Sequence, residues 1–65
     1  MKIIVNGDAR DVKEPTLDAA LEELGFGNRV VATALNGEFV SASARPSTSL
    51  EHGDRLEVLA PMQGG

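Results

Sequence analysis

Short apolar runs separated by glycine-containing turns divide the sequence into strand-like segments. Two of the turns are Asn-Gly pairs, Asn6-Gly7 and Asn36-Gly37, and each stands between two such runs. Asn-Gly in this position favours a two-residue hairpin turn, because both central residues of the turn need a positive φ. The pattern therefore predicts two hairpins. Their strands are residues 2–5 with 9–13, and residues 30–35 with 38–40.

Between the hairpins, apolar residues recur at the spacing of an α-helix. The stripe consists of Leu17, Ala20, Leu21 and Leu24, at positions i, i+3, i+4 and i+7. Thr16 is predicted to cap the start of the helix with its hydroxyl accepting from a free amide, and Gly25 to end it in the left-handed conformation. Two turns of helix are not stable alone in water, so this helix must pack on a sheet.

The remaining segments predict how the sheet is completed. Ala32 and Ala34 share one face of their strand, where small side chains are expected to let the helix approach closely. Residues 41–49 are rich in small and polar residues and are predicted to form a loop, after which Leu50 is expected to return to the core. Residues 55–60 alternate as a last strand should, and Pro61 is expected to end that strand.

The order of elements is therefore β, β, α, β, β, β. One sheet packed on one amphipathic helix is the arrangement that buries both apolar faces. We predict an α+β protein with a β-grasp fold, in which a mixed sheet of four to five strands packs on the helix. Residues 1–60 are expected to form this domain, and residues 61–65 a flexible C-terminal tail that ends in Gly-Gly.

Composition excludes several kinds of chemistry. The 65 residues include no cysteine and a single histidine, so disulfides, Cys–His catalysis and a structural zinc site are not expected. The chain has ten acidic residues and six scattered basic ones. This excess of negative charge disfavours nucleic acid as a ligand and suits a basic protein partner better. No apolar run approaches the roughly 20 residues that span a membrane. We expect a cytoplasmic protein with no metal site and no catalytic residue of its own.

The chemistry is predicted to lie in the last residues. A carboxylate is a poor electrophile, so a partner enzyme must activate the α-carboxyl group of Gly65 before anything can be attached to it. Glycine has no Cβ and accepts almost any φ, so Gly64 and Gly65 in series can enter a narrow channel on that partner.

Three segments carry a family resemblance that extends over essentially the whole chain. They are Ile3–Gly7, Val31–Val40 and Gly53–Gly65, the last ending in Pro-Met-Gln-Gly-Gly. The chain resembles the sulfur carrier proteins of thiamine thiazole biosynthesis (the ThiS type), which are ubiquitin-like β-grasp proteins. Residues 42–49 depart from the family pattern, in which a proline and a basic residue often follow the central strand sooner.

The resemblance implies a carrier that is a co-substrate and not an enzyme. An E1-like adenylating enzyme (ThiF type) would use ATP and Mg²⁺ to adenylate Gly65. A persulfide donor would convert the adenylate to a thiocarboxylate, and thiazole synthase (ThiG type) would accept the sulfur. The chain itself would bind no cofactor and would be a monomer when alone. Gly64 is expected to thread into the partner with Gly65, while Met62 and Gln63 line the entrance of the channel.

Two apolar residues of the predicted sheet, Phe39 and Leu59, are candidates for docking the partner, unless they belong to the core. Three other functions stay open on the sequence. They are a molybdopterin-type sulfur carrier, a ubiquitin-like modifier that is joined to lysines through Gly65, and a β-grasp interaction domain with an inert tail.

Overall fold

The computed structural model describes residues 1–61, and in that part of the chain it contains five strands, one α-helix and one 3₁₀ helix. Each element is short, with no strand longer than five residues. In chain order the elements are β1 (Lys2–Val5), β2 (Asp8–Asp11), α1 (Leu17–Glu23), β3 (Ala32–Leu35), β4 (Glu38–Val40), η1 (Ala42–Ser47) and β5 (Arg55–Leu59).

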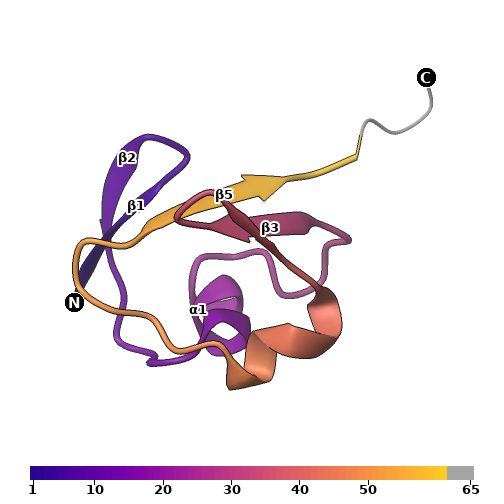
Figure 1. Cartoon of the computed structure of the whole chain (residues 1–65), viewed down its shortest axis with the longest axis horizontal. Helices are drawn as coiled ribbons and strands as arrows, with labels where there is room; N and C mark the ends of the chain where they lie inside the picture. The colour runs from indigo at the N-terminus through magenta and orange to yellow at the C-terminus, as the bar shows by residue number, and fades with distance from the viewer. Residues whose placement is uncertain (62–65) are drawn as a thin grey trace.

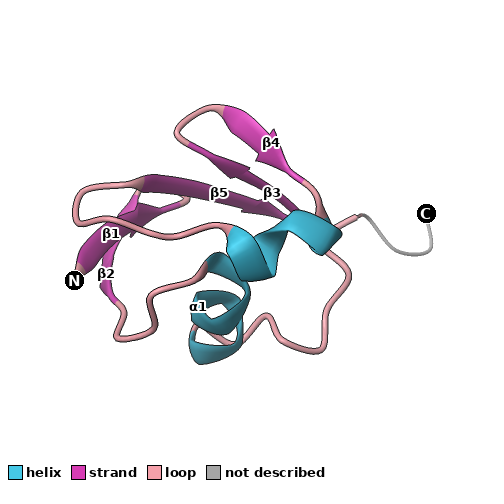
Figure 2. Ribbon diagram, turned by 60° about the horizontal axis from the view of Figure 1, so that its bottom comes forward, coloured by secondary structure: helices cyan, strands magenta, loops and turns pink. Residues whose placement is uncertain are grey.

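The five strands form one mixed sheet in the order β2-β1-β5-β3-β4. The two hairpins are antiparallel, β5 lies between them, and it runs parallel to β1 and antiparallel to β3. Both helices lie on the same side of the sheet (Figures 1 and 2). This arrangement confirms the predicted α+β class and the β-grasp fold, and the sheet has five strands.

Both Asn-Gly pairs form the predicted hairpin turns. Asn6 and Asn36 have φ values of 50° and 51°, and the glycine that follows each has a positive φ as well. The residues flanking each pair are register partners, so only two residues connect the strands of each hairpin. Two consecutive residues with positive φ match the twist of the flanking strands, which is why this dipeptide suits the position.

The helix buries its apolar stripe and ends as predicted. Gly25 has a φ of 97°, its N–H donates to the carbonyl of Glu22 over 3.1 Å, and the Phe26 N–H donates to the carbonyl of Leu21 over 2.8 Å. This pair of bonds defines a Schellman motif, which satisfies carbonyls that would otherwise have no partner at the helix end. Phe26 also packs against the core.

The predicted N-cap was wrong in its chemistry. The Thr16 hydroxyl makes no capping bond and instead donates to Oδ1 of Asp18 over 2.7 Å. The N–H of Leu17 finds its acceptor in the carbonyl of Thr48, 2.9 Å away. The first amide of the helix is thus satisfied by a backbone segment distant in sequence.

The core lies between the helix and the covered face of the sheet. Its centre includes Val12, just after β2, and Leu50, which returns to the core as predicted. The buried apolar residues are Ile3, Val5, Val12, Leu17, Ala20, Leu21, Leu50, Leu56 and Val58.

Two further expectations were wrong. The fully buried residue of β3 is Thr33, only 1% exposed, whereas Ala32 is exposed and Ala34 half-buried. The register with β5 causes this, because Thr33 lies opposite the buried Val58. The loop predicted for residues 41–49 contains the 3₁₀ helix η1, which packs against α1.

Candidate functional site

The candidate site begins where β5 ends, at the C-terminal end of the described chain. Leu59, Ala60 and Pro61 are all exposed, and the strand ends before Pro61 as predicted. The predicted site residues that follow are outside the described part of the chain. They are Met62, Gln63, Gly64 and Gly65.

The strand that leads to these residues is held firmly in the middle of the sheet. Leu56 and Val58 point into the core, while the residues between and after them point away from the helix. Strands on both sides pair with β5, so its direction is determined by the body of the protein. The sheet thereby defines the point and direction in which the chain leaves the domain (Figure 1).

An open sheet face lies beside this exit point, and both predicted docking residues are on it. Phe39 is 73% exposed and Leu59 69% exposed, so the alternative that they belong to the core is wrong. Phe39 lies opposite Ala34 across β3–β4, and Leu59 lies opposite Ala32 across β3–β5. The two small alanines leave the larger side chains standing above the sheet. We call this set of four residues the open-face patch.

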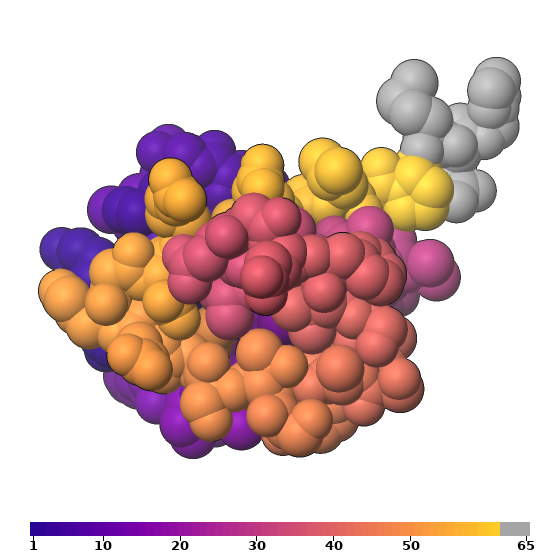
Figure 3. Space-filling view, in the orientation of Figure 1, coloured from indigo at the N-terminus to yellow at the C-terminus, as the bar shows by residue number. Residues whose placement is uncertain are grey.

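A shallow apolar depression of about 300 Å³ joins the open-face patch to the exit of the chain. Val30, which is 81% exposed, forms part of its wall. In the space-filling view, the gold and yellow side chains of β5 and the residues after it follow the upper margin of the molecule (Figure 3). The other lining residues are Val31, Ala32, Leu59, Ala60 and Pro61.

Arg45 supports one wall of this depression from the covered side, a role that was not predicted. Its Nη2 donates to the carbonyl of Val31 over 2.6 Å, and its Nε donates to Oγ1 of Thr33 over 3.1 Å. The Thr33 hydroxyl in turn donates to the carbonyl of Val40 over 2.7 Å. The only signal in the sequence was a lone basic residue within a run of small ones, because the folded position of η1 decides what Arg45 reaches.

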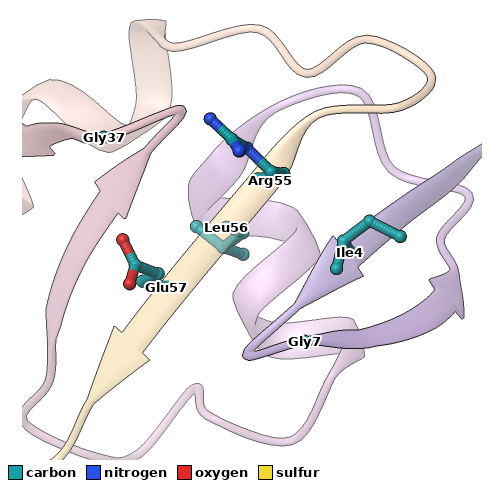
Figure 4. Close-up of a pocket in the computed structure, with 6 residues that line it drawn as sticks. All are labelled: Ile4, Gly7, Gly37, Arg55, Leu56 and Glu57. Carbon is teal, nitrogen blue, oxygen red and sulfur yellow. The ribbon is translucent and has the colours of Figure 1, made fainter.

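A second depression of about 300 Å³ lies between the two hairpin turns, away from the exit. Figure 4 shows Gly7 and Gly37 at its two sides, with Arg55 and Glu57 projecting from β5. These two charged side chains form a polar margin beside the open-face patch. Charges at such a margin guide the encounter with a partner more than they add affinity.

The described part of the chain offers no cluster of metal-binding side chains, and its one histidine lies in a turn. Among residues 1–61, no group of three or more His, Asp or Glu side chains is placed to hold a metal ion. His52 lies in an exposed turn, where its Nδ1 accepts from the N–H of Lys2 over 3.2 Å. No helix in this part of the chain is both long enough and apolar enough to span a bilayer.

A five-stranded mixed sheet on one helix, with its central strand leading to the last residues, defines the class: this is a ubiquitin-like β-grasp protein. The chain matches the ThiS family over residues 3–65. It therefore belongs to the ThiS family.

Individual relatives agree with this assignment. The chain is 41% identical to the sulfur carrier protein ThiS of Thermus thermophilus, over 94% of this chain and 95% of that protein. It is 38% identical to a thiazole synthase of Paramagnetospirillum magneticum, where it spans 20% of that protein's length. The crystal structure of the thiamine biosynthesis protein ThiS from Geobacter metallireducens superposes with a TM-score of 0.83 at 30% identity, with both chains fully covered.

Proposed function

We propose that this ThiS-family chain, a sulfur carrier of thiamine biosynthesis and not an enzyme, carries sulfur as a thiocarboxylate on Gly65. The observation that supports this most directly is the position of β5. The central strand of the sheet leads straight to the C-terminal residues, beside an exposed apolar surface. A partner can therefore hold the domain by its open face while the last residues enter its active site.

The chemistry follows from what a carboxylate needs. An E1-like adenylating enzyme of the ThiF type, with ATP and Mg²⁺, would form an acyl adenylate at Gly65 and release pyrophosphate. The terminal sulfur of a persulfide donor would then attack the acyl carbon, and the bond to AMP would break. Cleavage of the S–S bond by a thiol would leave the thiocarboxylate. Since the chain has no cysteine, it cannot carry the sulfur as a persulfide of its own.

The recipient we propose is a thiazole synthase of the ThiG type. The match to part of a Paramagnetospirillum magneticum thiazole synthase supports this partner, because sequences of both kinds then occur in one polypeptide. Nucleotide and metal would belong to the adenylating partner. We place these reactions in the cytoplasm, where ATP is available, and the chain alone as a monomer.

The tail residues have distinct roles in this scheme. Gly64 and Gly65 would enter the adenylation channel, and Met62 and Gln63 would line its entrance. Phe39 and Leu59, on the open-face patch, would contact the surface of the partner around that entrance. Side chains so exposed in the free protein are available for burial at such an interface.

Reconstitution tests this function. The chain is incubated with a ThiF-type enzyme, ATP, Mg²⁺ and a persulfide donor, and its intact mass is measured. We expect one oxygen to be replaced by sulfur, and mild hydrolysis to reverse the change. A matched variant with one extra alanine after Gly65 has no free glycine carboxylate at that position and should stay unmodified. Loading of both proteins, or of neither, would refute the assignment of sulfur to Gly65.

A further inference from the structure

The side chain of Asn6 acts as a short extension of β1. Its Oδ1 accepts from the N–H of Val58 over 2.8 Å, and its Nδ2 donates to the carbonyl of Val58 over 3.1 Å. A carboxamide offers one acceptor and two donors, so it can reproduce the pair of bonds that a backbone residue makes in a sheet. Asn6 thus adds one more rung to the ladder between β1 and β5.

This rung lies where β5 would otherwise lose its neighbour on the β1 side, whereas β3 pairs with β5 on the other side as far as Leu59. The backbone pairing of β1 with β5 consists of Ile4 with Arg55 and Val5 with Leu56, after which the chain turns away. The last backbone bond on that side runs from the N–H of Asn6 to the carbonyl of Leu56 over 2.9 Å. Beyond it, the Asn6 carboxamide is what holds this edge of the last strand.

We propose that Asn6 is a positioning residue for the C-terminal chemistry. By tying down Val58, three residues before Pro61, it limits the directions in which the chain leaves the sheet. Ala60 and Pro61 then leave the sheet in a restricted direction, so less conformational freedom is lost when a partner binds this end of the domain. This role rests on the proposed function and is exerted through β5, without contact with the reacting carboxylate.

The second hairpin provides a matched control. Asn36 is the first residue of the second Asn-Gly turn, as Asn6 is of the first, and the two residues have φ values of 51° and 50°. Its Oδ1 accepts from the N–H of Arg55 over 2.9 Å, and its Nδ2 donates to Oδ1 of Asp54 over 3.0 Å. Asn36 therefore holds the start of β5, whereas Asn6 holds the end that leads to the tail.

The experiment compares Asn6→Gly with Asn36→Gly, since glycine accepts the positive φ of both turns and removes the side chain that carries the carboxamide, by the same change at both sites. Amide hydrogen exchange should show faster exchange at Val58 in the first variant and at Arg55 in the second. The rate of adenylation by a ThiF-type enzyme is measured by pyrophosphate exchange. For Asn6→Gly this rate should fall about fivefold to tenfold, mainly through a lower kcat. That is the scale expected when one freed residue must be ordered again. For Asn36→Gly we expect less than a twofold change.

Equal adenylation of the two variants would overturn the positioning role, whatever their stabilities. If Asn6→Gly does not fold, Asn6→Asp replaces it, because a carboxylate still accepts from the Val58 N–H but cannot donate to the Val58 carbonyl. That variant should be adenylated more slowly than the wild type, and an unchanged kcat would overturn the role. Failure of the wild type itself to be adenylated would refute the proposed function. If the wild type is adenylated but the variants do not differ, only the positioning role of Asn6 is refuted.

Discussion

Truncation of Phe39 to alanine should weaken partner binding far more than it weakens the fold. A fully buried phenylalanine covers about 150–250 Å², and Phe39 keeps 73% of its surface exposed in the free protein. Roughly 110–180 Å² is therefore still available for burial by a partner, worth about 2.8–4.5 kcal/mol if all of it were covered, at about 25 cal/mol per Å². Since an interface rarely covers a side chain completely, we expect the substitution to cost about 2 kcal/mol of binding free energy. The KM for the carrier should then rise about 30-fold.

The assay is adenylation by a ThiF-type enzyme at varied carrier concentration. We expect KM to rise while kcat at saturation stays close to the wild-type value, because Phe39 would contribute to docking and not to the chemistry. Glu38→Ala is the matched control, since this neighbour on β4 is also exposed but points to the opposite face of the sheet. Its KM should change much less.

Thermal unfolding separates binding from folding. Substitution at so exposed a position usually changes stability by no more than about 0.5 kcal/mol. For a domain of this size the midpoint should then fall by no more than about 4 °C. An unchanged KM in Phe39→Ala, or an equal rise in Glu38→Ala, would refute the docking role of the open-face patch.

Three further predictions concern the tail and the fold. Gly64→Ala should prevent thiocarboxylate loading without moving the thermal midpoint, and intact-mass analysis that shows normal loading would refute the threading mechanism. Gly25→Ala should lower stability by about 1–2 kcal/mol in urea titrations, because its φ of 97° is strained for alanine. Thr33→Val should cost about 1–3 kcal/mol, since Arg45 Nε and the Val40 carbonyl would lose their partner. Wild-type stability would contradict either of the last two.

Local signals in the sequence were sufficient for the elements whose conformation depends on neighbouring residues. Asn6-Gly7, Asn36-Gly37 and Gly25 each need a positive φ, and the sequence places at these sites residue types that tolerate it. The apolar stripe of the helix follows from its own period, so it too was predicted. Together these signals limited the fold to one sheet on one helix.

Contacts between distant segments could not be predicted in this way. Thr48 supplies the acceptor for the first turn of the helix, and Arg45 reaches Val31 and Thr33, although nothing near these residues in the sequence indicates such contacts. The face of β3 was also assigned wrongly. Small size favoured the alanines as the residues nearest the helix, but register with β5 decides the face, and register depends on the assembled sheet.

For the candidate site, too, some features were predictable from the sequence and others were decided by the tertiary structure. The sequence by itself determined the cysteine-free composition, the Gly64-Gly65 pair and two apolar candidates for docking, because these are properties of residues and their order. Only the tertiary structure decided that Phe39 and Leu59 share an exposed face beside the exit of the chain, and that the Asn6 carboxamide pairs with Val58. Residues more than fifty positions apart become neighbours when β1 and β5 pair in parallel, and that pairing depends on the burial of both hairpins against one helix.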